Sequence, residues 1–350
     1  MIPISVVMPV YNTEVLLLKE AVDSILNQTF HEFEFIIIDD GSNDETKSFL
    51  TSLTDPRIKL IRNATNIGIT KSLNMGFRLA SGKYIARMDG DDISLPNRFE
   101  RQYAFMEANP DTIVCGSSIG LIGDRTGACL HWEKDMDYYR IVLLFYNPGP
   151  MHPTAFFNHE MLVRHNILYD ETLFYAQDYG MWTEVSRFGN VCILDDVLLY
   201  YRYHSSNISI AHREKQRECR RLVQKELLTE LMGPITDDEF EIHYHHCLNY
   251  FPNAVMTPEI LKWYQRLLKA NKEKHIYNQS KLKRKIDRYK EIQIQNMCKN
   301  EKFISKKAYL YIRYHAAVPT LIRKLKVKLL KYKCVSFLKT VIKQKRVSCP

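Results

Sequence analysis

The sequence predicts an α/β fold, in which a mostly parallel sheet has helices on both faces and is followed by a basic helical region. Three observations predict it. Short apolar, β-branched runs alternate with segments of helical periodicity over the first 120 residues. Polar residues follow these runs where strands would end, and Lys and Arg gather in the last quarter of the chain. Alternating strands and helices of these lengths are typical of a parallel sheet.

The first part of the chain contains four expected strands. The first is a continuous apolar run, ISVVMPV, which indicates a strand buried on both faces. The second, FEFIIID, has the same character and ends in two aspartates, a glycine and a serine. The predicted strands are 4–10, 33–39, 57–62 and 83–89.

A helix is expected after each of these strands. Thr13 is expected to cap the first helix, in which apolar residues recur at helical spacing from Leu16 to Ile25. The other predicted helices are 43–53, with Asn43 or Asp44 at its start, 70–80, and about Pro96 to Asn109.

The charge distribution separates the chain into two parts. Residues 1–260 hold 23 Lys and Arg against 36 Asp and Glu, whereas residues 261–350 hold 26 against 4. The net charge of +9 therefore belongs to the C-terminal part alone. We expect two domains, 1–210 and 211–350, of which the second is helical and faces an anionic partner.

Cysteine spacing and hydropathy exclude several classes of protein. The eight cysteines form no CxxC pair, so neither a metal cluster nor a disulfide framework is indicated, and free thiols in a reducing compartment are expected. The N-terminus lacks the basic region of a signal peptide, and no stretch is long and apolar enough to span a membrane. A cytoplasmic protein, dissolved or bound to a membrane surface, is the expectation.

Three aspartates stand at the end of the fourth predicted strand, in YIARMDGDDISLP. Asp89, Asp91 and Asp92 repel one another at this spacing unless a cation, hydrogen bonds or solvent compensate them. Polar clusters also end the first two strands, at 9–12 and 39–42. Carboxyl ends of parallel strands meet at one edge of the sheet, where ligands of open α/β folds bind. The aspartates are therefore expected in a binding site and not in a solvated turn.

The ligand is expected to be a nucleotide diphosphate held by a divalent cation. Neither GxGxxG nor GxxxxGK[ST] follows the first strand, so the usual glycine-rich phosphate loops are missing. Mg²⁺ and similar hard cations bind one or two carboxylates together with substrate phosphates. Asp39 or Asp40, with Tyr11, would then contact the nucleoside.

Five motifs resemble those of family-2 glycosyltransferases with the GT-A fold, which make bacterial surface polysaccharides. They are VVMPVYN, FIIIDDGSNDET, NIGITKSLNMG, GKYIARMDGDDISLPNRF and AQDYGMW, in the family's order over about residues 2–205. The resemblance implies a GT-A fold and an inverting transfer of a sugar, with Mn²⁺ or Mg²⁺ as cofactor. It also implies a nucleotide-sugar donor, with UDP-sugars as the first candidates, and a glycan or lipid-linked oligosaccharide acceptor.

The resemblance gives roles to residues at the ends of the first two strands. Pro9, Tyr11 and Asn12 match the loop that frames the base and the ribose. Asp40, the second of the Asp-Asp pair, matches the carboxylate that reads the edge of the base.

The next two motifs match the rest of the nucleotide site and the metal site. Asn66, Gly68 and Lys71 match the segment that closes the nucleotide pocket. Asp89 and Asp91 match the Asp-x-Asp motif, with Asp91 as the direct metal ligand. Asp92 is the weaker candidate.

Asp178 matches the family's catalytic base, which takes the proton of the acceptor hydroxyl. Relatives have Glu-Asp where this chain has Gln177 and Asp178. The amide at 177 removes one carboxylate but leaves the expected base in place. The alternative is that Asp178 is a helix cap, since the following residues have helical spacing.

Three further residues are less specific candidates. His152 lies in PGPMHPTAFF, which resembles the acceptor-side loop, so it is a candidate contact of the acceptor or donor sugar together with Gln177. His204 lies in YYRYHSSNIS, which resembles the segment over the diphosphate, and is a candidate ligand of phosphate or metal. A structural role is the alternative for both histidines. Trp182 is expected to pack in the core, with an aromatic sugar platform as the alternative.

The C-terminal part is expected to be helical. A first helix would run from about 213 to Gly233, charged helices would follow over 257–300, and 318–346 would form an amphipathic basic helix. The last of these fits an anionic membrane surface, on the inner face of the cell membrane. Packing against the catalytic domain is the second interpretation. Nucleic-acid binding is the third and is disfavoured, because no nucleic-acid module accompanies the charge.

The sequence therefore predicts a metal-dependent, inverting glycosyltransferase bound to the membrane surface. A catalytically silent scaffold with the same fold is the alternative from another class, and a nucleotidyltransferase is a third. Intact Asp40, Asp89, Asp91 and Asp178 argue against the scaffold. The missing glycine-rich loop argues against the nucleotidyltransferase.

Overall fold

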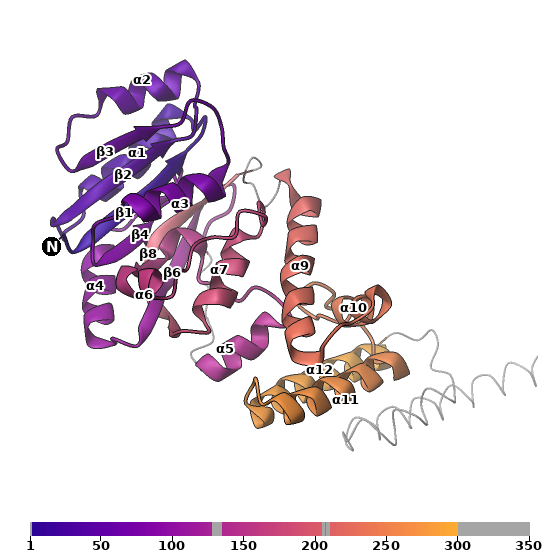
Figure 1. Cartoon of the computed structure of the whole chain (residues 1–350). Helices are drawn as coiled ribbons and strands as arrows, with labels where there is room; N and C mark the ends of the chain where they lie inside the picture. Colours follow the sequence, from indigo (N-terminus) through magenta and orange to yellow (C-terminus); the bar gives the residue numbers. More distant parts are fainter. Residues whose placement is uncertain (1, 128–134, 205–206, 208–210, 300–350) are drawn as a thin grey trace, which may run out of the picture. The chain divides into compact units, whose positions relative to one another are not determined.

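The structure of the protein is a computed structural model that describes residues 2–127, 135–204, 207 and 211–299 (Figure 1). The chain forms two compact units. The first comprises Met1–Leu143 and Asn147–Val223, and the second comprises Leu144–Tyr146 and the chain from Gln224 onward. A division into compact units does not show which segments fold independently, so the predicted boundary between residues 210 and 211 stays a prediction.

The first unit is built on one eight-stranded sheet of order β3-β2-β1-β4-β7-β6-β8-β5. Strands β1 to β4 are mutually parallel, as predicted, whereas β7 pairs antiparallel with both β4 and β6. The sheet is therefore mixed. The strands are β1 (Ile4–Val10), β2 (Phe33–Asp39), β3 (Ile58–Arg62), β4 (Tyr84–Arg87), β5 (Ile93–Ser94), β6 (Thr112–Gly123), β7 (Phe156–Asn158) and β8 (Asn190–Tyr203).

The order of the strands reverses at β1. From this strand the chain passes through β2 to β3 on one side and reaches β4 on the other. The crevice at such a switch point, outside the carboxyl ends of the strands, is where open α/β sheets bind ligands. The ends of β1 and β4 are therefore the place to look for a site.

Helices pack on both faces of the sheet. Val6 and Met8 of β1 share a buried cluster with helix α1, whereas Val7 points to the other face and meets Gly76 of helix α3. A Cβ at Gly76 would collide with the Val7 side chain, so glycine allows this close approach. The helices of this unit are α1 (Val15–Leu26), α2 (Asp44–Ser52), α3 (Ile69–Leu79), α4 (Arg98–Ala108), α5 (Met136–Leu143), α6 (His159–Arg164) and α7 (Gln177–Val185).

Two of the predicted helix starts can be compared with the caps. Asn43 caps α2, because its side chain accepts a hydrogen bond from the Thr46 N–H at 3.0 Å. The prediction that Thr13 caps α1 is wrong: the helix starts after Glu14, and no side chain caps it. The Thr13 carbonyl instead accepts a hydrogen bond from the Thr46 hydroxyl. The fourth strand also ends earlier than predicted, at Arg87.

The second unit is helical, as the sequence predicted. It contains the end of α9 (Arg213–Met232), followed by α10 (Asp237–Tyr244), α11 (Pro258–Lys274) and α12 (Gln279–Lys299). Gly233 has a φ of 80°, which suits the residue after a helix end. The short α10 was not predicted and begins with a capping box of Thr236 and Glu239. The predicted amphipathic helix 318–346 lies outside the described residues.

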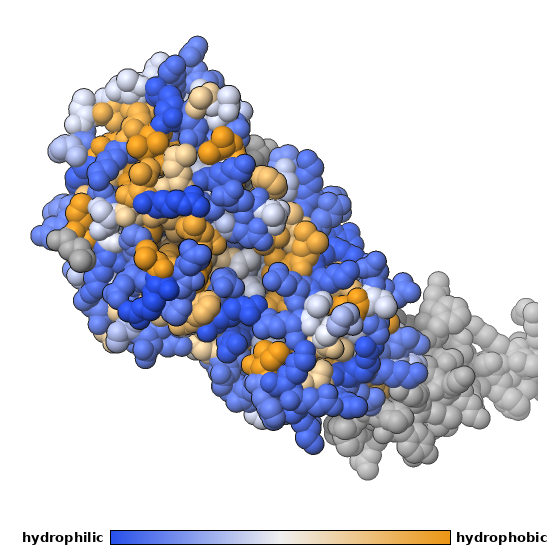
Figure 2. All heavy atoms as spheres, in the orientation of Figure 1, coloured by the Kyte–Doolittle hydropathy of each residue, from blue (hydrophilic) through white to orange (hydrophobic). Residues whose placement is uncertain are grey.

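Hydrophilic residues cover most of the face in Figure 2, and apolar residues gather over parts of the N-terminal strands and helices. Among the described residues, no helix has both the length and the apolar character that a membrane crossing requires.

A buried carboxylate, Glu34 of β2, joins three parts of the first unit. It accepts hydrogen bonds from the Ser5 hydroxyl, from Lys59, and from the backbone and hydroxyl of Ser81. Burial acts to raise the pKa of Glu34, but these donors outweigh it and lower the pKa from 4.5 to about 2. The ionised form is therefore the one that the fold stabilises.

We expect Glu34→Gln to lower the free energy of unfolding at pH 7 by about 2–3 kcal/mol, since a pKa difference of one unit is worth about 1.4 kcal/mol. The folded-state pKa is depressed, so this contribution is present above the unfolded pKa and is lost as the pH falls from about 5 to about 2. Urea unfolding of variant and wild type across that window measures it. Glu32→Gln is the control, because Glu32 is exposed. Equal pH dependence of the two variants would contradict the assignment.

Candidate active site

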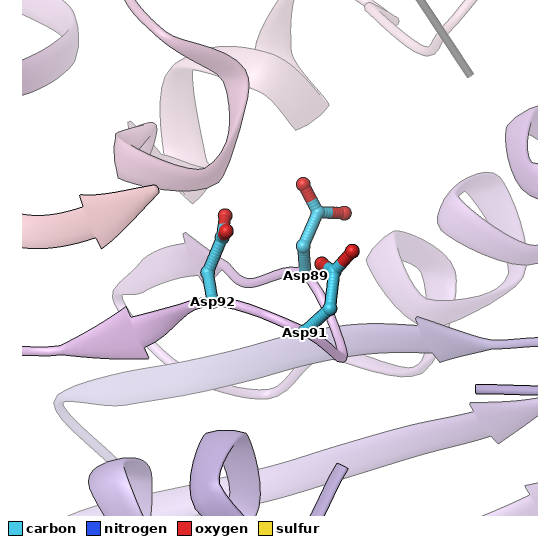
Figure 3. Close-up of side chains that lie close together, drawn as sticks. All are labelled: Asp89, Asp91 and Asp92. Atoms are coloured by element: carbon cyan, nitrogen blue, oxygen red, sulfur yellow. The ribbon is translucent and has the colours of Figure 1, made fainter. Parts of the chain in front are cut away.

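Three carboxylates gather in the loop after β4, at the switch point of the sheet. Asp89, Asp91 and Asp92 each place an oxygen within 4.8 Å of the other two, and Figure 3 shows their side chains extending to the same side of the loop. Asp92 is buried, and Asp89 and Asp91 are half-buried. The convergence that the sequence predicted is therefore present.

Neighbouring groups compensate part of this negative charge. Arg87, which is buried at the end of β4, forms an ion pair with Asp89. His204 Nε2 lies 3.0 Å from Asp91 Oδ2, and the backbone N–H of Arg202 donates to Asp92 Oδ1 at 2.8 Å. The structure thus brings His204, a predicted ligand of phosphate or metal, to Asp91.

The compensation is incomplete. Burial, followed by the charges of Asp89 and Asp91, raises the pKa of Asp92 well above its usual range. Burial is also the largest cause that raises the pKa of Asp89, and the Arg87 charge opposes it. Asp92 Oδ2 is buried and has no hydrogen-bond partner among the described residues. A bound cation would satisfy this oxygen and lower the cost of keeping the three carboxylates ionised.

The residues present fit a hard divalent cation. Carboxylate oxygens are the ligands that Mg²⁺ and Mn²⁺ prefer, and three carboxylates leave further coordination positions for phosphate oxygens. Among the described residues, neither a cysteine nor a histidine belongs to the group. Its composition therefore suits Mg²⁺ or Mn²⁺ better than zinc.

The loops that follow β1 and β2 are fastened to each other. Asn12 has a φ of 49°, its N–H donates to the Ser42 hydroxyl at 3.1 Å, and its side chain accepts from the Asn43 N–H at 2.8 Å. Asn12 thereby holds the loop after β1 against the loop after β2. Tyr11 beside it is 51 % exposed, so its ring is free to meet a ligand, and Pro9 is half-buried.

Asp40 fixes the start of α3. Its carboxylate accepts from the backbone N–H groups of Ile67 and Gly68, both at 2.9 Å, and from the Asn63 side chain at 2.8 Å. A carboxylate has about four acceptor positions, so about one is left for a ligand. The predicted contact with a base edge is compatible with this count and stays a prediction.

The segment that Asp40 holds carries the other predicted nucleotide contacts. Gly68 has a φ of 94°, a conformation that favours glycine, and it precedes the first residue of α3. Asn66 and Lys71 are exposed on either side of it. The three predicted residues therefore surround one helix start, with Lys71 in its first turn.

Asp178 is the second residue of α7. Ala176 is the cap position of that helix and makes no side-chain bond, so the alternative that Asp178 caps the helix is wrong. Asp178 Oδ2 accepts from the Asn147 side chain at 2.8 Å. Burial raises the pKa of Asp178, while hydrogen bonds from Tyr179 and Asn147 and the charges of Arg220 and Arg87 oppose the rise.

The charges of Asp178 and of Asp89, a member of the acidic group, both act on Tyr169. Burial raises the pKa of Tyr169, and the charges of both Asp178 and Asp89 add to the rise. Both carboxylates therefore lie within electrostatic reach of one hydroxyl. The hydroxyl also bonds to His152 Nε2 at 2.7 Å.

The remaining predicted contacts are less accessible. Burial, followed by the Arg87 charge, holds the pKa of His152 well below its usual range, so this imidazole is neutral at pH 7. Gln177 is buried, and its Oε1 has no partner among the described residues. Trp182 is fully buried and stacks on Phe157. Core packing is what the structure shows for Trp182, and no ring face is uncovered for a sugar.

Sequence reasoning missed four residues of this site: Arg87, Asn147, Tyr169 and Phe174. Arg87 is buried and pairs with Asp89 two residues away, but its strand pattern does not distinguish it. Tyr169 is buried and bonds to His152, which lies too far along the chain for a local pattern to indicate. Phe174 is 50 % exposed, and its ring lies 3.8 Å from where a Cβ on Gly68 would stand. The sequence signal that could have indicated Phe174 was an aromatic residue four positions before the predicted base, Asp178.

Comparisons with known proteins agree with the motifs. A family model described as glycosyl transferase family 2 matches residues 5–165. An uncharacterized glycosyltransferase of Haemophilus influenzae is 34% identical over 253 residues, which cover 67% of this chain and 76% of that protein. The putative glycosyltransferase EpsE of Bacillus subtilis is 43% identical over 128 residues, which are 35% of this chain and 45% of EpsE.

A solved structure has the same fold. Residues 1–349 of S. aureus TarS, in complex with UDP-GlcNAc, superpose with a TM-score of 0.56 at 18% sequence identity. The match covers 87% of this chain and 94% of that one. At this identity the likeness concerns the arrangement of strands and helices.

Proposed function

Because the chain belongs to glycosyl transferase family 2 and is a nucleotide-sugar glycosyltransferase with a GT-A fold, we propose that it transfers a sugar from a UDP-sugar to a hydroxyl of a glycan or lipid-linked acceptor, with inversion. One observation carries the proposal. The carboxylates of Asp89, Asp91 and Asp92 each place an oxygen within 4.8 Å of the other two, and the buried Asp92 Oδ2 has no hydrogen-bond partner among the described residues. Such a group suits a divalent cation and the diphosphate of a donor, and the motifs assign the separate Asp178 as the base.

In the proposed reaction, the acceptor oxygen bonds to the anomeric carbon while the bond from that carbon to the diphosphate oxygen breaks. The nucleoside diphosphate leaves with the bonding electrons. Asp178 accepts the proton of the acceptor hydroxyl, and its Asn147 partner keeps one oxygen oriented. Attack opposite the leaving group inverts the configuration at the anomeric carbon.

Asp89, Asp91 and Asp92 would hold a divalent cation, and Arg87 and His204 would orient the first two of them. When bound, the cation supplies Lewis-acid stabilisation of the departing diphosphate. Tyr11, Asp40 and the segment from Asn66 to Lys71 would bind the nucleoside and its diphosphate. These assignments rest on the family's motifs, with which the observed positions are compatible.

The acceptor and the cellular setting are also part of the proposal. Membrane association through the basic helix 318–346 would bring the enzyme to lipid-linked acceptors, as the resemblance to enzymes of surface polysaccharide synthesis implies. That helix lies outside the described residues, so its predicted membrane contact stays a prediction.

A donor panel tests the proposed function. UDP, GDP, ADP and their common sugar conjugates are added with and without Mn²⁺, and thermal stability and release of nucleoside diphosphate are measured. TarS, which shares the fold, holds UDP-GlcNAc, so UDP-sugars are the first donors to try. We expect UDP compounds with Mn²⁺ to raise the Tm by several degrees, because a ligand at 100 times its Kd stabilises by about 2.7 kcal/mol. No stabilisation by any nucleotide would favour the silent scaffold.

A further inference from the structure

We propose that Asn74 is a positioning residue, which fixes the segment leading to Asp178 against helix α3. The inference rests on the proposed function, since it concerns how the base is placed relative to the donor. Asn74 lies in the motif NIGITKSLNMG but has no role assigned by the resemblance, and the inference specifies what it controls: the rate of transfer and not the binding of the donor.

Asn74 makes a three-point contact with a segment 95 residues further along the chain. Its Oδ1 accepts from the backbone N–H of Tyr169 at 2.9 Å, and its Nδ2 donates to the backbone carbonyl of Tyr169 at 2.9 Å. Nδ2 also donates to Glu171 Oε1 at 3.1 Å. The side-chain amide therefore holds one residue's peptide groups as a neighbouring strand would.

Burial makes this contact costly to lose. Asn74 is 1 % exposed and Tyr169 is 2 % exposed, so water does not replace the hydrogen bonds when the amide is removed. A buried N–H and a buried carbonyl would then be left unsatisfied. The segment has to move to reach solvent, and it carries Asp178 with it.

Helix α3 connects this contact to the donor side of the site. Its first residue follows Gly68, whose N–H is held by Asp40. After Tyr169 the chain returns toward the same helix start, because the Phe174 ring lies next to Gly68. A single rigid helix therefore sets the spacing between the nucleotide segment and the segment that ends at Asp178.

This spacing matters for the rate. Alignment of the reacting groups supplies much of the acceleration in a two-substrate transfer, and a misplacement of about 1 Å can lower the rate by roughly 100-fold. Donor affinity depends on Asp40 and the residues around Gly68, which Asn74 does not contact. Loss of Asn74 should therefore separate kcat from donor binding.

The experiment compares two buried asparagines: Asn74, in the middle of α3, and Asn63, which bonds to Asp40 near the start of that helix. Asn74→Ala releases the segment before Asp178, whereas Asn63→Ala removes the bond of 2.8 Å to Asp40 on the donor side. For Asn74→Ala we expect kcat to fall roughly 100-fold, with donor KM and the UDP-dependent Tm shift within about twofold of wild type. For Asn63→Ala we expect the donor KM to rise and the Tm shift to shrink.

Two further measurements protect the test from a folding failure. Hydrogen exchange on the ligand-free protein should show loss of protection at the Tyr169 amide in Asn74→Ala but not in Asn63→Ala. Tyr169→Phe leaves the backbone contact to Asn74 intact, so it should keep this protection.

Combining Asn74→Asp with Glu171→Gln reverses donor and acceptor between positions 74 and 171. We expect this pair to recover part of the kcat that Asn74→Asp alone loses, because it removes the repulsion between two carboxylates, while the bond to the Tyr169 carbonyl stays lost in both variants.

An equal fall in kcat and donor affinity for Asn74→Ala, or an unchanged kcat, would overturn the proposal. The proposed function fails in a different way, through a wild-type protein that no nucleotide stabilises. The exchange measurement needs no ligand, so it reports on the Asn74 contact in either case.

Discussion

Asp178→Asn is expected to lower kcat by about a thousandfold, because general-base catalysis contributes roughly 100- to 10,000-fold and an amide cannot accept the acceptor's proton. Asparagine has the same shape, so the fold should be kept. Donor binding should not change, because Asp178 stands apart from the acidic group that would hold the diphosphate. Steady-state kinetics with the preferred donor, together with the UDP-dependent Tm shift, measures both quantities.

The pH dependence provides a second check on Asp178. The base acts as a carboxylate, so kcat/KM should fall as the pH drops through the raised pKa of Asp178. The Asn147 hydrogen bond lowers that pKa, so Asn147→Ala should move the acid limb to higher pH. Glu184→Gln on the same helix is the control, because Glu184 forms only a surface ion pair with Arg187. A kcat that survives Asp178→Asn would eliminate this residue as the base.

Asp91→Ala is expected to abolish the metal-dependent part of nucleotide binding. Removing one of three clustered carboxylates takes away a metal ligand, and we expect the affinity for Mn²⁺ to fall by more than about 100-fold, since even outer-shell partners of metal ligands are worth about 10- to 100-fold. The Mn²⁺-dependent rise in Tm with UDP should then disappear. Chelation of the wild type should give the same result.

Two comparisons separate this effect from general damage. Asp23→Ala removes an exposed carboxylate that pairs with Lys19, and it should leave the metal-dependent shift intact. Asp91→Ala should itself lose little stability without metal, because it relieves repulsion within the acidic group. A metal-dependent Tm shift that persists in Asp91→Ala would place the cation elsewhere.

Local patterns were enough to predict the elements that frame the site. The apolar runs of β1 and β2 and the cap at Asn43 depend on residues close together in the sequence. The meeting of Asp89, Asp91 and Asp92 with the ends of β1 and β2 followed from the geometry of parallel strands. The motifs then implied a role for Asp178 that the strands alone did not.

The contacts that orient these residues could not be predicted. The strand pattern does not distinguish Arg87 from its neighbours. In the structure Arg87 is buried and forms an ion pair with Asp89. Asn74 and Asn147 form hydrogen bonds with residues that are distant in the sequence, and no periodicity of the sequence encodes such pairs. Thr13 was expected to cap α1 because threonine favours that position. The helix instead starts one residue later, and the Thr13 carbonyl accepts a hydrogen bond from Thr46 of α2. Tertiary contacts here outweigh local preference.

The contact between Arg202 and Asp92 has a consequence for synthesis on the ribosome. Strand β4 and the three aspartates leave the ribosome about a hundred residues before Arg202, at the end of β8, and His204, which follows it; these two residues bond to Asp92 and Asp91. At roughly 5–20 residues per second, the nascent chain exposes this acidic loop for about 5–20 s without those two partners. The nascent N-terminal part therefore already carries the three carboxylates but lacks the residues that bond to two of them. The acidic site is completed late in translation, after the strands that support it have emerged.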